Sequence, residues 1–584
     1  MTMTLSTIDW IIIGSFFALS LGIGLLFKNR AQGGLKDFFL GGRKMPWLLA
    51  GVSMVATTFA ADTPLAVTEL VGKHGVSGNW LWWSFLAGGM LTTFFFAHLW
   101  HRSGVLTEVE LIELRYSGKV AKFLRGFKAI YLGLFMNILI MAWVNLALLS
   151  ILEVFFGIER SEGLLYLLAA MGVAAFYAAL SGIWGVAVTD AVQFVIAMTA
   201  TIILAVLVLK EPAVGGIDGL KAQLPSWRFQ FFPKIDSAAS TGEALSLGIG
   251  AFLAYVSVQW WASWYPGAEP GGGGYVAQRF MSVKEPKKAV YATLFFQIAH
   301  YCLRPWPWIL VALACLVLYP ELNESNYQKG YVMAMRDFLP TGLKGLLLTA
   351  FFAAYMSTIS TQLNWGSSYL INDVYKRYIK PEASSKNLVF NSRLITFVLM
   401  LLAVFITQFI DSIAGVWSFL IECGAGLGLV LILRWYYWRI NAITELVATI
   451  SPFVAFAISK FLLDLEFPQS FFFTVGFTTV SWIVAMVLSK PTNFETLKAF
   501  YEKVQPEGAW KPIQKISSVK KEKSSNLFIM TVAWLSAIIF CYSALFTFGS
   551  LIFKNSNEAI IYGAVSVFSC LILIRLIRRN NLWS

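Results

Sequence analysis

The chain has 584 residues, of which 58% are hydrophobic and only 13% are charged. A protein of this composition cannot cover its surface with polar side chains, so a water-soluble fold is excluded. The net charge of +13 requires no nucleic acid partner, because basic loops that face anionic lipid account for most of it. The composition predicts an all-α polytopic membrane protein in a lipid bilayer.

Apolar runs recur along the whole chain, and about fifteen are long enough to cross a hydrocarbon core of about 30 Å. No basic segment precedes Asp9 and no small-residue cleavage site follows the first run, so we interpret that run as a retained helix and not as a signal peptide. The expected spans are 7–28, 47–72, 80–100, 123–156, 163–182, 186–210, 244–265, 288–318, 343–372, 389–410, 413–435, 441–464, 470–489, 526–552 and 558–577.

The second span is interrupted by polar residues and a proline. Asp62, Thr63 and Pro64 stand between two apolar stretches. Pro64 has no backbone N–H and pushes Thr63 away from helical geometry. We expect a helix broken near the middle of the membrane, whose freed carbonyl groups are able to bind a cation. The alternative is a simple proline kink that neighbouring hydroxyl groups repair.

Three later spans each contain an ionisable residue, namely Asp190, Arg304 and Glu422. Such residues are costly at membrane depth and therefore indicate function. Each has an alternative: Asp190 as an interfacial carboxylate, Arg304 as a helix cap beside Pro305, and Glu422 at a close helix contact. The seventh span ends in the aromatic sequence Trp260–Tyr265, which is typical of an interfacial belt or, alternatively, of a surface that faces the solute.

The ninth span carries a cluster of hydroxyl groups at Ser357, Thr358, Ser360 and Thr361. A helix places Ser357, Ser360 and Thr361 on one face. Such a face suits a small hard cation such as sodium, since neutral oxygen atoms replace its water shell and a soft metal would require Cys or His. The alternative is that these hydroxyl groups bond to carbonyls of their own helix or join neighbouring helices.

Lysine and arginine gather in alternate loops, and the loops between them are balanced or acidic. The positive-inside rule then places the amino terminus outside and the carboxyl terminus in the cytoplasm, which requires an odd number of spans. We expect a multi-pass protein of the plasma membrane, such as a bacterial inner membrane. The basic loops include Arg43, Lys44, Arg115, Lys119, Arg279, Lys284, Lys376, Arg377, Arg434 and Lys520.

The sequence does not favour an enzyme. Its five cysteines have no CxxC spacing and its four histidines are scattered, so neither a disulfide framework nor a metal enzyme is expected. No nucleotide-binding loop is present, and no organic cofactor is expected. The acids at 62, 190 and 422 lie on separate spans without a histidine partner. A solute sensor would need a soluble signalling domain, for which the polar stretch 490–525 is too short.

Four ordered motifs carry a family resemblance. They are Phe39–Trp47, Ser181–Gln193, the pair Gln278-Arg279, and the serine-rich ninth span that ends in Asn372–Tyr375. Together they resemble the sodium:solute symporter family, which includes sodium-coupled carriers of sugars, proline, pantothenate and sialic acid. The likeness extends from the first span to about the thirteenth.

The resemblance implies an inverted-repeat transporter core of ten helices, with five-helix halves at 47–210 and 244–435. One helix precedes this core and several follow it. The implied domains are an extra helix and loop at 1–46, the transport core at 47–435, two further membrane helices at 436–489, a cytoplasmic linker at 490–525, and two membrane helices with a tail at 526–584.

The resemblance also implies a main sodium site between the broken helix and the ninth span. Its matching positions are the carbonyl groups of Ala56, Phe59 and Ala354 and the hydroxyl groups of Ser357 and Thr358. Family members that bind a second sodium ion resemble this chain at Asp190, Ser360 and Thr361.

The solute pocket departs from that of the family's sugar carriers. Where those carriers have an acid-amide pair and an Asn-Gln pattern, this chain has Asp62-Thr63 and Pro266-Gly267. Asp62 and Thr63, joined by Trp264 and Glu422, are the residues expected to face the solute. The expected function is sodium-coupled symport of a small organic solute by alternating access, in which bound sodium raises the affinity for solute. A transporter-like sensor and a polytopic membrane enzyme are the alternatives.

Overall fold

The computed structural model describes residues 5–31, 33–233, 249–261, 273–324, 326–410, 420, 423–424, 426–519 and 527–579. Within these ranges the chain is helical, and the only strand-like pairings are isolated bridges such as that between Met45 and Val283. Twelve helices are long and apolar enough to span a membrane, and a bent pair forms a thirteenth span. The two other expected spans, 244–265 and 413–435, extend beyond the described residues.

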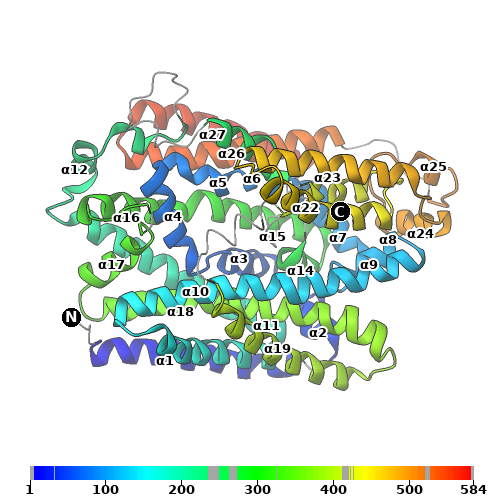
Figure 1. The fold of residues 1–584 in the computed structure, drawn as a ribbon, viewed down its shortest axis with the longest axis horizontal. Helices are drawn as coiled ribbons and strands as arrows, with labels where there is room; N and C mark the ends of the chain where they lie inside the picture. Colours follow the sequence, from blue (N-terminus) through cyan, green and yellow to red (C-terminus); the bar gives the residue numbers. More distant parts are fainter. Residues whose placement is uncertain are drawn as a thin grey trace.

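The helices run roughly side by side as a bundle (Figure 1). The amino terminus lies at the same end of the bundle as α12 and α17, and α24 and α25 lie at the opposite end. The helices up to the middle of the chain are α1 (Thr7–Phe27), α2 (Leu35–Leu40), α3 (Trp47–Thr57), α4 (Asp62–His74), α5 (Trp80–Trp83), α6 (Phe85–Leu91), α7 (Ala97–Ser103), α8 (Glu110–Arg115), α9 (Gly118–Ile130), α10 (Asn137–Phe156), α11 (Arg160–Lys210) and α12 (Gly216–Gln223).

The remaining helices belong to the second half of the chain. Its members are α13 (Ile249–Ser257), α14 (Gly274–Ser282), α15 (Pro286–Ile298), α16 (Pro305–Leu318), α17 (Lys329–Phe338), α18 (Leu343–Tyr369), α19 (Ser385–Thr407), α21 (Leu427–Tyr436), α22 (Ala442–Phe461), α23 (Gln469–Leu488), α24 (Phe494–Val504), α25 (Lys511–Gln514), α26 (Leu527–Ile552) and α27 (Ser556–Arg579).

Helix α11 contains two spans that meet at Gly182. The backbone there has φ of 56° and ψ of −152°, and a Cβ atom at this position would lie 2.4 Å from the carbonyl oxygen of Phe38. Only glycine tolerates both the positive φ and the close approach. The two spans, 160–180 and 182–210, agree with the expected division of this segment.

The second expected span is broken, as its sequence predicts. Helices α3 and α4 meet at an angle of 56°. Pro64 lies in the first turn of α4, where a missing N–H disturbs no helical hydrogen bond. The break therefore falls at residues 58–61, ahead of the proline, and the alternative of a simple kink at Pro64 is wrong.

Helix α18 lies in the interior of the bundle. From Ala353 to Tyr369 every one of its residues is buried, and it packs against α11, α1, α3, α10 and α19. A helix covered on all sides needs no polar face for solvent, so its hydroxyl groups are available for contacts between helices. Helix α3 is one of those neighbours, and this contact positions the candidate site.

Part of the expected linker 490–525 is folded against the core. Helix α24 packs on α7 and α8, and Trp510, just before α25, is fully buried. The indole N–H of Trp510 donates to the carbonyl of Trp435 over 2.8 Å. The guanidinium of Arg115 lies 4.8 Å from the ring of Trp510. These residues anchor the segment that joins the core to α26 and α27.

Four charged side chains join α8, α9 and the helical segment Leu370–Ile379 that follows α18, near this same end of the bundle. Asp373 is fully buried and accepts hydrogen bonds from Nε and Nη2 of Arg125 at 2.7 and 2.5 Å. Arg125 and Arg377 both donate to Glu113. The hydrogen bond from Arg377, together with that from Arg125, lowers the pKa of Glu113 to about 2. The stabilisation that ionised Glu113 contributes is complete above a pH of about 4.5 and is lost as the pH falls through about 2.

We predict that Asp373→Asn destabilises the protein by about 3 kcal/mol, because the change leaves the buried guanidinium of Arg125 with a weaker partner. The measurement is the free energy of unfolding in detergent. Asp218→Asn is the matched control, since Asp218 pairs with Lys554 on the surface and an exposed pair contributes at most about 1 kcal/mol. Equal losses in the two variants would contradict the importance of burial.

Candidate functional site

The end of α3 contacts α18 through backbone carbonyls and hydroxyl groups. The hydroxyl of Thr358 donates to the carbonyl of Thr57 over 2.8 Å and to the carbonyl of Ala354 over 3.2 Å. One turn further along α18, the hydroxyl groups of Thr57 and Thr361 lie 3.0 Å apart. Thr358 therefore sits between the backbone of its own helix and the last residue of α3.

The five residues predicted for the main sodium site belong to these two segments. Ala56 precedes Thr57, and Phe59 lies in the break, whereas the other three are on α18. All five are at least 97% buried: Ala56, Phe59, Ala354, Ser357 and Thr358. Their carbonyl and hydroxyl oxygen atoms are neutral hard donors, the type that suits a small hard cation.

Ser357 has a different partner from Thr358. Its hydroxyl donates to Asp190 Oδ1 over 2.8 Å, and Ser53 on α3 donates to the other carboxylate oxygen of Asp190. Asp190 has no exposed surface. The alternative of an interfacial carboxylate is therefore wrong, and Asp190 links α11 to both α3 and α18.

Arg279 on α14 completes this network. It is fully buried, and its Nη2 lies 3.7 Å from Asp190 Oδ2. It donates to Ser53 over 3.1 Å and to Thr361 over 2.6 Å. The expectation that Arg279 is a charge of a basic loop is wrong, because its guanidinium points into the core and finds a carboxylate there.

The residues predicted for a second sodium site thus adjoin a guanidinium group. Asp190 and Thr361 both contact Arg279. Ser360 instead donates to the carbonyl of Ser357 over 3.2 Å. The sequence held only a general signal for this pair, because an acid within an apolar span requires a cationic partner; it did not indicate that Arg279 is that partner.

Asp62 is the first residue of α4 and is 3% exposed. Among the residues that the structure describes, its Oδ1 atom has no hydrogen-bond partner. Thr63 beside it is half-buried. The side chain of Trp143 and the backbone N–H of Thr63 also interact with this carboxyl, and its Oδ1 atom is open to a donor from a bound molecule. Trp264 and Glu422, the other residues expected to face the solute, lie outside the described residues.

Arg304, just ahead of α16, caps the broken end of α3. Its Nη1 donates to the carbonyl of Val55 and the hydroxyl of Thr58, both at 2.9 Å, and its Nη2 donates to the carbonyl of Thr58 over 3.0 Å. Its guanidinium also lies 5.1 Å from the ring of Trp308. Arg304 is thus a cap, as one interpretation of the sequence had it, but for α3 and not for the helix that it precedes.

Within the described part of the chain, no group of three or more His, Cys, Asp or Glu side chains is placed to hold a metal ion. The oxygen-rich contact between α3 and α18 is built from neutral groups, with one buried ion pair beside it. This arrangement suits reversible contact with a weakly bound cation.

Comparisons with known proteins show the family of the chain. The family model described as "Sodium:solute symporter family" matches residues 38–451. A sodium/glucose cotransporter of Vibrio parahaemolyticus is 24% identical over 82% of this chain and 89% of its own length. The sodium/sialic acid symporter SiaT of Proteus mirabilis is 23% identical over 83% of this chain and 95% of its own length.

A solved structure has the same fold. It is the substrate-bound, outward-open state of a sodium-coupled sialic acid symporter, with a TM-score of 0.66 and 19% identity. The match covers 84% of this chain and 99% of the other. The architecture is therefore an all-α transporter core of inverted five-helix repeats, with one preceding helix and several following helices.

We predict strong coupling between Asp190 and Arg279. Asp190→Asn and Arg279→Gln each leave one buried charge without its partner, which costs about 3 kcal/mol or more. The double variant removes both charges, so its loss in the free energy of unfolding should fall short of the sum of the single losses by at least about 1 kcal/mol. Additive losses would show that the two side chains do not depend on each other.

Proposed function

The chain belongs to the sodium:solute symporter family, and we propose which of its residues couple sodium to the solute. The family is one of transporters and not of enzymes, and this protein is a sodium-coupled symporter of a small organic solute. The observation that carries the proposal is the hydroxyl of Thr358, which joins the carbonyl of Thr57 to that of Ala354 where α3 breaks.

Sodium binds at this contact in our proposal. The ion takes the carbonyl oxygens of Ala56, Phe59 and Ala354 and the hydroxyl oxygens of Ser357 and Thr358. To do so, it displaces the hydrogen bond between Thr358 and Thr57 and ties α3 to α18 through its own ligand shell. Because sodium and solute then favour the same arrangement of these helices, each raises the affinity for the other.

The energy of the sodium gradient is sufficient for uptake. One sodium ion that moves down a membrane potential of 100 mV releases about 2.3 kcal/mol before any concentration gradient is counted. At about 1.4 kcal/mol for each tenfold change, this energy supports accumulation of a neutral solute by several tens-fold.

We propose that one sodium ion binds at a time in the arrangement described here. Asp190 and Thr361 already have the guanidinium of Arg279 as their cation. A sodium ion at Asp190, Ser360 and Thr361 would lie close to that positive charge in an environment of low dielectric, where repulsion is strong. The second site is available only if Arg279 turns away from Asp190.

Asp62 and Thr63 are the proposed contacts of the solute. The Oδ1 atom of Asp62 lacks a donor among the described residues, and Asp62 begins the helix that follows the break. A solute with an amino or hydroxyl group supplies the hydrogen-bond donor that this oxygen atom lacks. Trp264 and Glu422 stay predicted contacts.

The proposed orientation places the amino terminus outside and the carboxyl terminus in the cytoplasm, across the plasma membrane. The segment of α24 and α25 lies at the end of the bundle opposite the amino terminus (Figure 1). The basic residues Lys498, Lys503 and Lys511 belong to that segment, which agrees with a cytoplasmic position.

Uptake into proteoliposomes tests the function. A panel of labelled sugars, amino acids and carboxylates is presented with an inward sodium gradient, and separately with potassium in place of sodium. At least one solute should accumulate only with the sodium gradient and a negative interior. Equal uptake in the two salts would contradict sodium coupling.

We predict that Thr358→Ala raises the sodium concentration for half-maximal uptake at least tenfold, because one of five ligands is lost from an intact helix. Thr349→Ala is the control, since Thr349 is a buried hydroxyl on the same helix, about two and a half turns before Thr358. An unchanged sodium dependence in Thr358→Ala would remove this residue from the site.

We predict that Asp62→Asn separates solute binding from sodium binding. The amide keeps the size of the side chain but changes its hydrogen-bonding groups, so the affinity for solute should fall at least tenfold. Sodium binding measured without solute, from the change in tryptophan fluorescence, should stay within about twofold. If the variant loses sodium binding as completely as Thr358→Ala, Asp62 is an ion ligand.

A further inference from the structure

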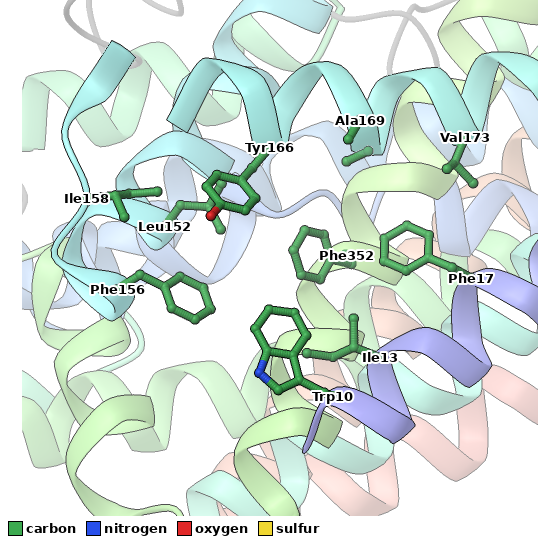
Figure 2. A pocket seen from close by; sticks show the side chains of 11 residues that line it. Trp10, Ile13, Phe17, Leu152, Phe156, Ile158, Tyr166, Ala169, Val173 and Phe352 are labelled. Atoms are coloured by element: carbon green, nitrogen blue, oxygen red, sulfur yellow. The ribbon is translucent and has the colours of Figure 1, made fainter. Parts of the chain in front are cut away.

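A cavity of about 430 Å³ lies among α1, α10, α11 and α18, apart from the sodium and solute positions. Figure 2 shows its side chains arranged around an open centre, with Trp10, Ile13 and Phe17 on α1, Tyr166 and Val173 on α11, and Phe352 on α18. Its volume is in the range of about 300–1,000 Å³ that is usual for ligand pockets.

The cavity is lined almost entirely by hydrocarbon. Trp10 and Tyr166 supply its only side-chain nitrogen and oxygen atoms. These two residues are 54% and 55% exposed. Their neighbours Ile11 and Leu165 are 60% and 70% exposed, so the surface beside the cavity is apolar too. Within spans of a membrane protein such a surface faces lipid and not water.

The cavity has the depth of one leaflet. Trp10 stands in the first turn of α1, and Tyr166 lies in the second turn of α11. From Trp10 to Phe17, and likewise from Tyr166 to Val173, is seven residues, or about 10 Å of helix. The hydrocarbon of one leaflet is about 15 Å deep. The cavity therefore begins near one membrane surface, where tryptophan and tyrosine are favoured, and reaches toward the bilayer centre.

We propose that an acyl chain of a membrane phospholipid, from the leaflet on the side of the amino terminus, occupies this cavity. An acyl chain matches the cavity in chemistry and in depth. It leaves a medium that is as apolar as the cavity, so the hydrophobic effect contributes little. Its binding rests on van der Waals contact with a shaped wall, and the fit therefore depends on the length and branching of the chain.

Occupancy of the cavity affects α18. Phe352 forms part of the cavity wall, two residues before Ala354 and five before Ser357 on the same helix. An acyl chain in the cavity packs against Phe352 and restrains this part of α18. In an empty cavity the side chain of Phe352 lacks these contacts. The acyl chain thus adjusts the position of the sodium ligands. This second step rests on the proposed sodium site, whereas binding of the chain does not.

The test of binding uses the full protein in nanodiscs that contain a phosphatidylcholine with a photoreactive diazirine in its palmitoyl chain. Cross-links should concentrate on peptides that contain Trp10, Phe17 or Tyr166. Ala169→Trp places a large side chain at the cavity and should lower those cross-links at least fivefold. Val195→Trp, on a 63% exposed position of the same helix, should leave them unchanged.

Cross-links spread evenly over exposed apolar residues, or equally abundant in Ala169→Trp, would overturn the proposal, because they would show ordinary boundary lipid only. So would two copies of the chain in each nanodisc with no lipid cross-link at Trp10, Phe17 or Tyr166, since a second copy would then cover the cavity. These outcomes do not depend on transport, so they separate this proposal from the proposed function.

The test of coupling compares sodium binding in liposomes of straight-chain and methyl-branched phosphatidylcholines. The sodium concentration for half-maximal fluorescence change should differ at least threefold between the two lipids in the natural chain. In Ala169→Trp it should differ less than 1.5-fold. Equal sodium affinity of the natural chain in both lipids would overturn the coupling step, and cross-linking would still decide whether the acyl chain binds.

Discussion

A backbone carbonyl at membrane depth must have a partner, because no water is available to supply one. The break between α3 and α4 creates this requirement in the middle of the bundle. Arg304 satisfies the carbonyls of Val55 and Thr58, and Thr358 satisfies that of Thr57. The first of these partners carries a fixed charge, whereas the second is a hydroxyl group that a cation is able to replace.

Two buried guanidinium groups hold α3 at different points. Arg304 binds its carboxyl end, and Arg279 reaches Ser53 in its middle. Asp190 joins that middle part to α18 through Ser53 and Ser357. Movement of α3 against α18 must break the bond from Thr358 to Thr57 and the link through Asp190 together. Each buried hydrogen bond that is left unmade is costly. Such a set favours two discrete arrangements over gradual deformation, which is what alternating access requires.

The sequence predictions that the structure confirms rest on the periodicity of apolar residues and on the backbone chemistry of proline. Pro64 predicted the break. The hydroxyl spacing placed Ser357, Ser360 and Thr361 on one face, but of these only Thr361 contacts α3 directly, and Thr358 makes the other contact. The partners of Arg279 and Arg304 were not predictable, because they lie on helices far apart in the chain and depend on packing. Helix α24 was predictable from the sequence but was not predicted. Its buried face has helical spacing, at Leu497, Phe500, Tyr501 and Val504. The polar composition around these residues indicated a linker instead.

The most direct test of the central claim is a crystal structure with thallium ions in place of sodium, located by their anomalous scattering. The account predicts one strong peak, surrounded by the carbonyls of Ala56, Phe59 and Ala354 and the hydroxyls of Ser357 and Thr358. The hydroxyl of Thr358 should then point its oxygen at the ion and no longer donate to Thr57. A peak beside Asp190, with the bond from Thr358 to Thr57 intact, would contradict the account.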